Sequence, residues 1–263
     1  MKKIKKKIYE SYFSSHYSSL DKKQNEIEYI KKSEHGKQFI EFLPSNSDIK
    51  IIDLGCGTGS LVSGLKNSGY KNVYGIDVSL ENIEQGKLAD LDINQAEIID
   101  FLDQSIENNK HYDVVFLMDV LEHLDDDELY DVVDKVRQVL SSNGIFIIKT
   151  INAESIISGM GRYMDITHER SFTSHSMKEL MSAFGYKELE ILNSKINKPK
   201  NIREFLRSLI RKSWYYLIYR VIESRDYPEC IDVDIVIKVK LSVGAYIAPN
   251  INIFIFIKIG AFI

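Results

Sequence analysis

A short segment of the chain places one carboxylate just before three closely spaced glycines. Asp53 follows two isoleucines and is itself followed by Gly55, Gly57 and Gly59. Glycine lets the backbone turn tightly and approach a ligand closely, and the first N–H groups of a following helix can donate hydrogen bonds to that ligand. The pattern predicts a strand, a turn and a helix that together hold a nucleotide-sized ligand.

Two further carboxylates end predicted strands. Asp77 closes a predicted strand over 72–78, and Asp100 closes one over 96–100. An acidic residue about 20 residues after such glycines can accept hydrogen bonds from both hydroxyls of a ribose, and open parallel sheets bind ligands outside the carboxyl ends of their strands. We expect Asp53, Asp77 and Asp100 to lie along one such edge. The alternative for each is a simple polar cap at the end of a strand.

A third group of polar side chains follows the predicted strand 112–119. Asp119, Glu122 and His123 have the spacing i, i+3 and i+4, so they share one face if the chain turns helical there. Two carboxylates and an imidazole that face a crevice can form a metal site, or a general base with the partner that orients it. We expect this face at the ligand-binding edge of the sheet.

The elements that must position these residues alternate between short apolar runs and helical patterns, which indicates a mainly parallel sheet. The predicted strands cover 50–55, 72–78, 96–100, 112–119, 144–150, 186–192 and 230–241, and helices are predicted over 125–140, 175–185 and 201–223. The predicted fold class is therefore α/β, a seven-stranded, mainly parallel sheet with helices on both faces. The last two strands are expected to pair like a hairpin at one edge.

The composition favours a small-molecule partner. The 263-residue chain has a formal net charge of -4, so it lacks the excess of Lys and Arg that neutralises nucleic-acid phosphates. Its two cysteines, Cys56 and Cys230, are too few for a disulfide framework, and its basic N-terminus lacks the apolar stretch of a secretory signal. We expect a cytoplasmic protein with a helical N-terminal cap (1–44), one domain (45–242) and an apolar tail (243–263) without an assigned role.

The basic aromatic helix predicted over 201–223 allows two interpretations. It contains five basic residues together with Trp214 and three tyrosines. We favour a helix that covers the fold. The alternative is contact with a membrane surface or an anionic lipid-linked substrate, peripheral to the inner membrane face. The tail 243–263 is interrupted by Pro249 and Lys258, so it is not expected to span a membrane.

Three motifs in order resemble the class I S-adenosylmethionine-dependent methyltransferases. They are "DLGCGTG" at 53–59, "GIDVS" at 75–79 and "DVVFLMDVLEHL" at 113–124, and the resemblance extends over about residues 45–190. It implies the Rossmann-like fold and S-adenosylmethionine as the cofactor. The cofactor-binding residues that it implies are Asp53, Gly55, Cys56, Gly57, Thr58, Gly59, Asp77, Val78, Asp100, Phe101, Met118 and Asp119.

Two further similarities concern the methyl acceptor. The run 119–123 is similar to the E-x-x-E-H run that binds a divalent cation in ubiquinone O-methyltransferases and small-RNA 2′-O-methyltransferases, with Asp119 in place of the first Glu. The segment 165–173, "DITHERSFT", is similar to a segment of methyltransferases of bacterial sugar and envelope biosynthesis. The resemblance implies His168 and His123 as candidate bases, or a Mg or Mn site formed by Asp119, Glu122, His123 and His168.

The remaining candidate residues are proposed to contact the acceptor. Arg162 and Arg170 could clamp an anionic group or form surface ion pairs, and Tyr12 and Tyr17 could close the pocket or simply pack. The predicted function is O-methylation of a sugar, sugar nucleotide or phosphate-type precursor of a bacterial capsule or cell-envelope polysaccharide. The alternatives are a noncatalytic cofactor-binding protein and, less favoured because Ser60 occupies the last glycine position of the dinucleotide pattern, a nicotinamide-dependent oxidoreductase.

Overall fold

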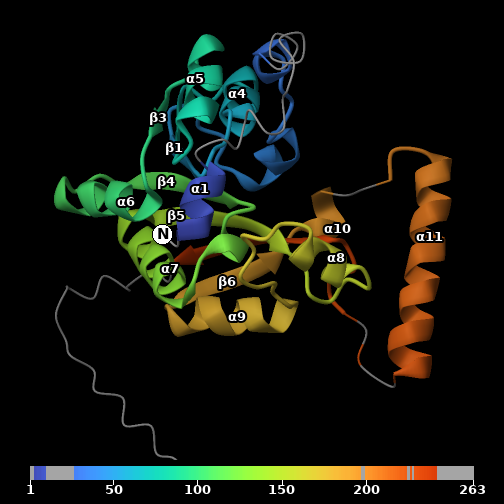
Figure 1. Cartoon of the computed structure of the whole chain (residues 1–263). Helices are drawn as coiled ribbons and strands as arrows, with labels where there is room; N and C mark the ends of the chain where they lie inside the picture. The colour runs from blue at the N-terminus through green and yellow to red at the C-terminus, as the bar shows by residue number, and fades with distance from the viewer. Residues whose placement is uncertain (1–2, 10–26, 197–198, 224–225, 227, 242–263) are drawn as a thin grey trace, which may run out of the picture.

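A seven-stranded sheet forms the centre of the protein, in the strand order β3-β2-β1-β4-β5-β7-β6 (Figure 1). The computed structural model describes residues 3–9, 27–196, 199–223, 226 and 228–241. The strands are β1 (Lys50–Leu54), β2 (Asn72–Asp77), β3 (Ile93–Gln95), β4 (Tyr112–Met118), β5 (Leu140–Ile151), β6 (Tyr186–Ile191) and β7 (Asp234–Leu241). The five strands from β3 to β5 pair in parallel, whereas β7 pairs antiparallel with both β5 and β6. The predicted fold class is confirmed, and so is the hairpin-like pairing of the last two strands at one edge, where β6 is the outermost strand.

Helices cover both faces of the sheet because successive strand residues point to opposite sides. The covering helices are η1 (Lys37–Phe42), α4 (Ser60–Asn67) and α5 (Leu80–Leu88) on one face, and α6 (Ile98–Glu107), α7 (Asp126–Val139) and α9 (Ser174–Ala183) on the other. In β1, Ile51 packs with the first group and Ile52 with the second. In β4, Val114 packs with the first group and Val115 with the second. The sheet therefore separates two apolar cores and holds the carboxyl ends of its central strands in register.

The strand predicted over 96–100 is wrong. β3 ends at Gln95, and α6 begins at Ile98. Ile98, Leu102 and Ile106 follow a helical spacing of four residues and pack against the core beside α7, and this burial outweighs the short apolar run that predicted a strand. Asp100 consequently lies in the first turn of a helix instead of at the end of a strand.

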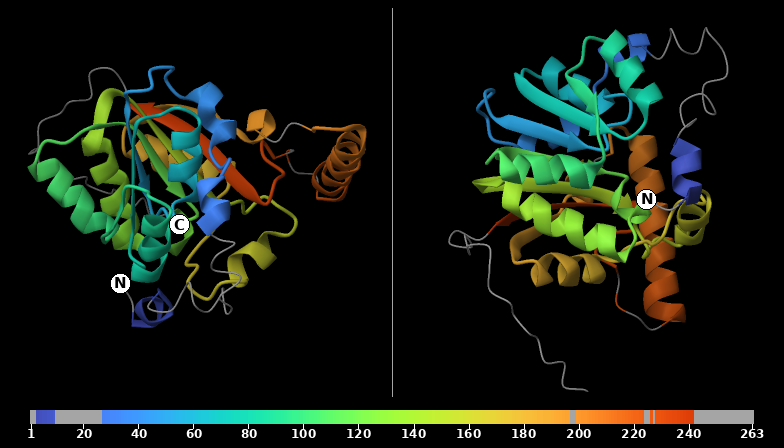
Figure 2. Two further views of the ribbon diagram at one scale, coloured as in Figure 1. Left: turned by 90° about the horizontal axis from the view of Figure 1, so that it is seen from above. Right: turned by 60° about the vertical axis from the view of Figure 1, so that its left-hand side comes forward.

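The long helix predicted over 201–223 does not cover the sheet, contrary to the interpretation favoured from the sequence. α11 (Ile202–Tyr216) continues into the π-helical segment η3 (Leu217–Ile222) and stands at one side of the body (Figures 1 and 2). Tyr215 is the buried residue of α11. No helix among the described residues has the length and apolarity needed to cross a membrane.

The shorter helices lie around the carboxyl ends of the central strands or next to α11. They are α1 (Lys3–Tyr9), η2 (Leu121–His123), α8 (Ser158–Tyr163) and α10 (Asn193–Ile196). The predicted pocket residues Tyr12 and Tyr17 lie outside the described residues, as does the predicted tail 243–263.

Candidate active site

The glycine turn after β1 is held against the neighbouring strand. The N–H groups of Gly55 and Cys56 both donate to the carbonyl of Ile76, at 2.8 Å. Gly57 has φ +55°, and a Cβ placed on it would meet no atom within 4 Å. The turn therefore exposes backbone to open space at Gly57, as close approach of a ligand requires.

Asp77 is fixed at the end of β2 by the turn that it faces. Its Oδ2 accepts a hydrogen bond from the N–H of Gly57 at 2.9 Å. Its Oδ1 accepts from the N–H of Ser79 at 2.8 Å and from Nδ2 of Asn82 at 3.3 Å. Burial raises the pKa of Asp77, and these hydrogen bonds act in the opposite direction. The carboxylate thus joins β2, the glycine turn and α5 at one point of the cavity wall.

Asp53 is a buried carboxyl group behind the glycine turn. Its exposed fraction is 2%, and its Oδ1 has no hydrogen-bond partner among the described residues. Burial, together with the nearby carboxylates of Asp77 and Asp119, raises the pKa of Asp53 to about 8. A ligand with positive charge would relieve this repulsion. The site therefore fits S-adenosylmethionine, which carries a sulfonium and an ammonium group.

A cavity of about 500 Å³ opens in front of these groups. It is lined by Gly55, Gly57, Asp77, Val78, Asp100 and Asp119 of the predicted set, together with His123. Residues that sequence reasoning missed also line it, namely Lys5, Asn82, Ala96, Glu97, Ile98, Ile99, Val120, Leu124, Glu128 and Val132. The apolar residues at the start of α6 give the cavity an apolar wall that suits a flat ring. Their helical spacing in the sequence was the signal that could have found them.

Several predicted cofactor residues do not line the cavity. Phe101 packs toward Tyr112 instead, with ring centroids 6.2 Å apart. Cys56 is buried against Gly75, and burial raises the pKa of its thiol. Asp53, Thr58, Gly59 and Met118 are also absent from the cavity wall, so these six predicted residues have positions in the strands, the turn or the core rather than at the cavity.

The N-terminal helix α1 contributes a buried lysine to the cavity. Lys5 is 3% exposed and donates to the carbonyl oxygen of His123. Its Nζ also lies 3.6 Å from a carboxylate oxygen of Glu128 and 3.4 Å from one of Glu169. These charged partners compensate the burial of the ammonium group and fix α1 over the cavity. An N-terminal cap was predicted, but without this residue.

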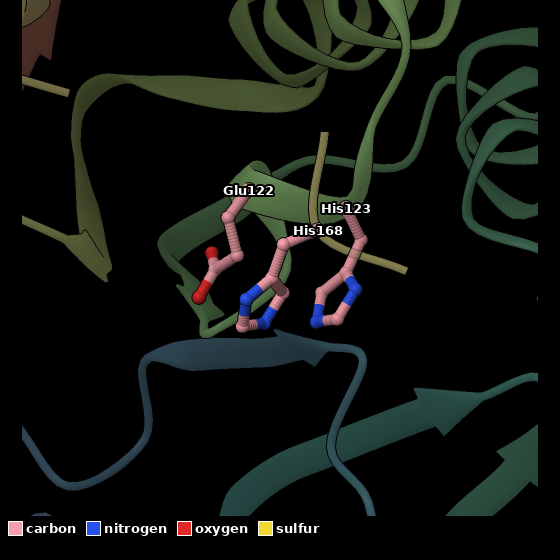
Figure 3. Close-up of side chains that lie close together, drawn as sticks. All are labelled: Glu122, His123 and His168. Carbon is pink, nitrogen blue, oxygen red and sulfur yellow. The ribbon is translucent and has the colours of Figure 1, made fainter. Parts of the chain in front are cut away.

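Glu122, His123 and His168 come together beside the cavity (Figure 3). One potential ligand atom from each lies within 4.8 Å of the others, and the two imidazole centroids are 4.6 Å apart. Asp119 does not belong to this cluster, contrary to the predicted set of four. It adopts φ +56° after β4, which breaks the expected helix, and its carboxylate pairs with Lys149 at 2.7 Å. The helical face expected from the spacing therefore does not form.

Hydrogen bonds set the protonation of both imidazoles. Nδ1 of His168 lies 2.9 Å from the carbonyl oxygen of Gly161, so Nδ1 donates and the neutral ring keeps the lone pair on Nε2. Nδ1 of His123 lies 2.8 Å from the hydroxyl of Thr167, which itself donates to Asp165 at 2.7 Å. Nδ1 of His123 is therefore also a donor. Burial and the neighbouring His168 lower the pKa of His123 to about 4.

Glu122 connects η2 to the loop that carries His168. Its backbone carbonyl accepts hydrogen bonds from the N–H groups of Glu169 at 2.7 Å and Arg170 at 3.3 Å. Its side chain is 2% exposed and accepts a hydrogen bond from the hydroxyl of Thr150 at 2.9 Å. Burial is the main cause that raises the pKa of Glu122 to about 7. The two backbone contacts join residues that lie more than 40 positions apart in the sequence.

Arg162 and Arg170 have protein partners next to the cluster. Arg162 donates to the carbonyl of Glu169 at 2.7 Å, and Arg170 pairs with the exposed carboxylate of Asp126 at 2.9 Å. Neither lines the cavity. Arg162 therefore makes a contact with the loop, and Arg170 makes a surface ion pair. Neither has the position of the predicted clamp on an anionic acceptor.

Comparison with known proteins places the chain in a family. The methyltransferase domain family matches residues 28–191. The ubiquinone biosynthesis O-methyltransferase of Rickettsia typhi is 36% identical over 110 residues, which cover 40% of this chain and 42% of that protein. That of Pelagibacter ubique is 31% identical over 111 residues, which cover 40% and 43%. The chain spans less than half the length of these curated relatives.

Solved structures share the fold. The structure of an S-adenosylmethionine-dependent methyltransferase from Archaeoglobus fulgidus superposes with a TM-score of 0.59 at 18% identity, over 87% of this chain and 97% of that one. Magnesium protoporphyrin IX methyltransferase from Synechocystis PCC 6803 superposes with a TM-score of 0.52 at 12% identity, over 91% and 99%. Because the family match covers more than half of the chain, and the sheet and the glycine turn agree with it, the chain belongs to the methyltransferase domain family of class I S-adenosylmethionine-dependent enzymes.

Proposed function

We propose that the protein transfers the methyl group of S-adenosylmethionine to a hydroxyl oxygen of a small-molecule acceptor. The observation that carries this proposal is the shared cavity. The glycine turn and Asp77 form one side of it, His123 lies on the other side, and Glu122 and His168 lie next to His123 behind the cavity wall. A nucleoside bound at the first side would present its reactive end toward the second.

The residues of the chain have separate roles in this proposal. The backbone at Gly57 and the carboxylate of Asp53 receive the amino-acid end of the cofactor, Asp77 binds the ribose hydroxyls, and Asp100 with the apolar start of α6 flanks the adenine. When bound, the cofactor supplies an electrophilic methyl carbon on a sulfonium. Nε2 of His168 accepts the proton of the acceptor hydroxyl as its oxygen attacks, a contribution of about 10² to 10⁴ in rate.

His168 is the preferred base because of its orientation and because His123 is too weak a base. A general base works best when its pKa lies near the working pH, and the pKa of His123 is held at about 4. The Gly161 carbonyl orients His168 so that its proton-free Nε2 is the available atom. His123, tied to Thr167 and Asp165, is assigned to positioning the ring of His168.

A divalent cation is a second role proposed for the same cluster. One carboxylate and two imidazoles, with ligand atoms within 4.8 Å of one another, make a donor set that suits Mn²⁺ or Zn²⁺ better than Mg²⁺, which prefers oxygen ligands. Such an ion would lower the pKa of the acceptor hydroxyl and hold its oxygen.

The acceptor belongs to one of two chemical classes. The segment 165–173 supports a sugar or phosphate-type precursor of a bacterial capsule or envelope polysaccharide, although Arg170 of this segment and Arg162 of α8 already have protein partners. The names of the curated relatives support a quinol-type phenol. Both present a hydroxyl to the base, which is the chemistry that the cluster requires.

The test is mass spectrometry of candidate acceptors after incubation with the full chain and S-adenosylmethionine. Sugar nucleotides, phosphosugars and quinols are compared, each with Mn²⁺, with Mg²⁺ and with a chelator. We expect one added methyl group on an oxygen of one class, and equal yield with chelator if the histidine alone is the base. Cofactor binding without product from any class would contradict the enzymatic proposal and favour a noncatalytic binding protein. Binding of a nicotinamide dinucleotide in place of S-adenosylmethionine would favour an oxidoreductase.

A further inference from the structure

The helix formed by α11 and η3 turns its apolar side away from the body of the protein. This outward face consists of Ile202, Phe205, Leu206, Leu209, Ile210, Tyr216 and Leu217, all of which are exposed. On a helical projection these residues lie on one side, and Tyr215 and Tyr219, which contact the body, lie on the other. Ile202, for example, is 72% exposed, whereas Tyr215 is 2% exposed. An amphipathic helix that merely covered the fold would have the opposite orientation.

The helix is attached to the segment that leads to the active-site loop. The hydroxyl of Tyr215 accepts a hydrogen bond from the N–H of Ile156 at 3.0 Å and lies 3.2 Å from the hydroxyl of Ser155. The hydroxyl of Tyr219 donates to the carbonyl of Glu154 at 2.6 Å. These contacts hold the chain just before α8 against α11 and η3.

A second group of exposed apolar side chains lies between α11 and the histidine cluster. This loop patch consists of Ile156, Ile157, Met160, Tyr163, Met164 and Ile166, each about half exposed or more. It surrounds α8, which lies between the body and α11 in Figure 1. The carbonyl of Gly161 in α8 also orients His168. The apolar surface therefore reaches the residues that hold the candidate base.

The charge of this region is opposite to that of the rest of the chain. Residues 199–223 carry six basic and two acidic side chains, a formal charge of +4, although the whole chain has -4. Arg203 and Lys212 flank the outward face on its two sides, and both are exposed. Basic side chains beside an apolar helix face are typical of helices that lie in the headgroup layer of an anionic membrane.

We propose that the outward face of α11 and η3 docks on the surface of an anionic lipid bilayer. Docking buries the exposed apolar side chains among the acyl chains near the headgroups, and the flanking arginine and lysine side chains reach the lipid phosphates. A second copy of the chain is a poorer partner, because two faces flanked by positive charge would repel each other.

The test uses vesicle flotation with the full chain, comparing phosphatidylcholine alone with a mixture that contains phosphatidylglycerol. We expect binding to the anionic vesicles, little binding to the neutral ones, and weaker binding at high salt because salt screens the attraction. The double variant Leu206→Glu and Leu209→Glu should lower the partition coefficient at least about tenfold. The matched control is Leu88→Glu, which changes a similarly exposed leucine of α5 and should bind like the wild type.

Each other outcome overturns the proposal. Absence of wild-type binding to anionic vesicles would do so directly. Unchanged binding by the double variant would assign membrane contact to a segment outside α11. A dimer detected by light scattering without lipid, and abolished by the same two substitutions, would assign the face to a second copy of the chain. The affinity for S-adenosylmethionine, measured for every variant, reports folding and separates failure of docking from failure of the proposed function.

Discussion

The two sides of the cavity are held by different kinds of contact. On the cofactor side, the sheet fixes the geometry, because β1 and β2 pair in parallel with Asp53 opposite Gly75 and the turn donates to Ile76. On the acceptor side, η2 and the loop 165–173 meet through hydrogen bonds at Glu122 and His123. The first side is set by backbone register and the second by a few side chains on a long loop. Substitutions should therefore separate cofactor affinity from turnover.

The largest expected effect is on the acceptor side. His168→Ala removes the proposed base, so turnover should fall by about 10² to 10⁴. The affinity for S-adenosylmethionine should stay unchanged because His168 does not line the cofactor cavity. Calorimetry measures the affinity, and methyl transfer to the accepted acceptor measures the turnover. His175→Ala, at an exposed histidine of α9, is the matched control. Full activity of the His168 variant would remove both of its proposed roles.

The next effect is on the cofactor side. Asp77→Ala deletes the carboxylate that holds the N–H of Gly57 and is proposed to bind the ribose, so the affinity for S-adenosylmethionine should fall by about a hundredfold, as expected for lost hydrogen bonds to a charged group. Turnover at saturating cofactor should change much less. Asp92→Ala, at an exposed aspartate before β3, should bind as the wild type does. Equal affinity of the two variants would contradict the ribose assignment.

A smaller effect is a pH dependence of cofactor affinity. The pKa of Asp53 is about 8 in the unliganded protein, so at pH 6 its carboxyl group holds a proton. A cationic ligand favours the ionised form, and binding must release that proton. Because the ionised fraction of Asp53 rises from about 1% at pH 6 to about one half at pH 8, affinity should rise by up to about fiftyfold between these pH values. Asp53→Asn cannot ionise, so the ratio of wild-type to variant affinity isolates the contribution of this carboxyl group from that of the ligand's own amine. A ratio that does not vary with pH would contradict the placement of positive charge beside Asp53.

The glycine turn and the acidic end of β2 could be predicted from the sequence because their geometry is local. Glycines at positive φ, an apolar strand and an acidic strand end follow from the residues themselves, as at Gly57 and Asp77. Where two local patterns compete, the prediction failed. The short apolar run in residues 96–100 resembles a strand, but burial of Leu102 against the core makes the segment a helix.

The acceptor side could be predicted only in part because it depends on contacts between distant segments. The resemblance brought His123 and His168 together, but no local pattern shows that the carbonyl of Glu122 accepts from residues 169 and 170. No local pattern shows either that the carboxylate of Asp119 pairs with Lys149 or that Lys5 lines the cavity. These positions are set by the tertiary fold.

Two amphipathic helices show the same limit for surfaces. α7 and α11 both have apolar residues at spacings of three and four. α7 buries Leu129, Val132 and Val136 in the core, whereas α11 buries Tyr215 and exposes its apolar face. Periodicity predicts that a helix has an apolar face, but it does not predict what covers that face.

The central claim is that one side of the cavity binds S-adenosylmethionine and the other side receives the acceptor. A crystal structure of the full chain with S-adenosylhomocysteine tests it most directly. The account predicts the ribose hydroxyls at Asp77, the amino-acid end at Gly57 and Asp53, and the sulfur facing the cluster of Glu122, His123 and His168. Ligand density elsewhere on the protein, or the sulfur turned away from that cluster, would contradict it.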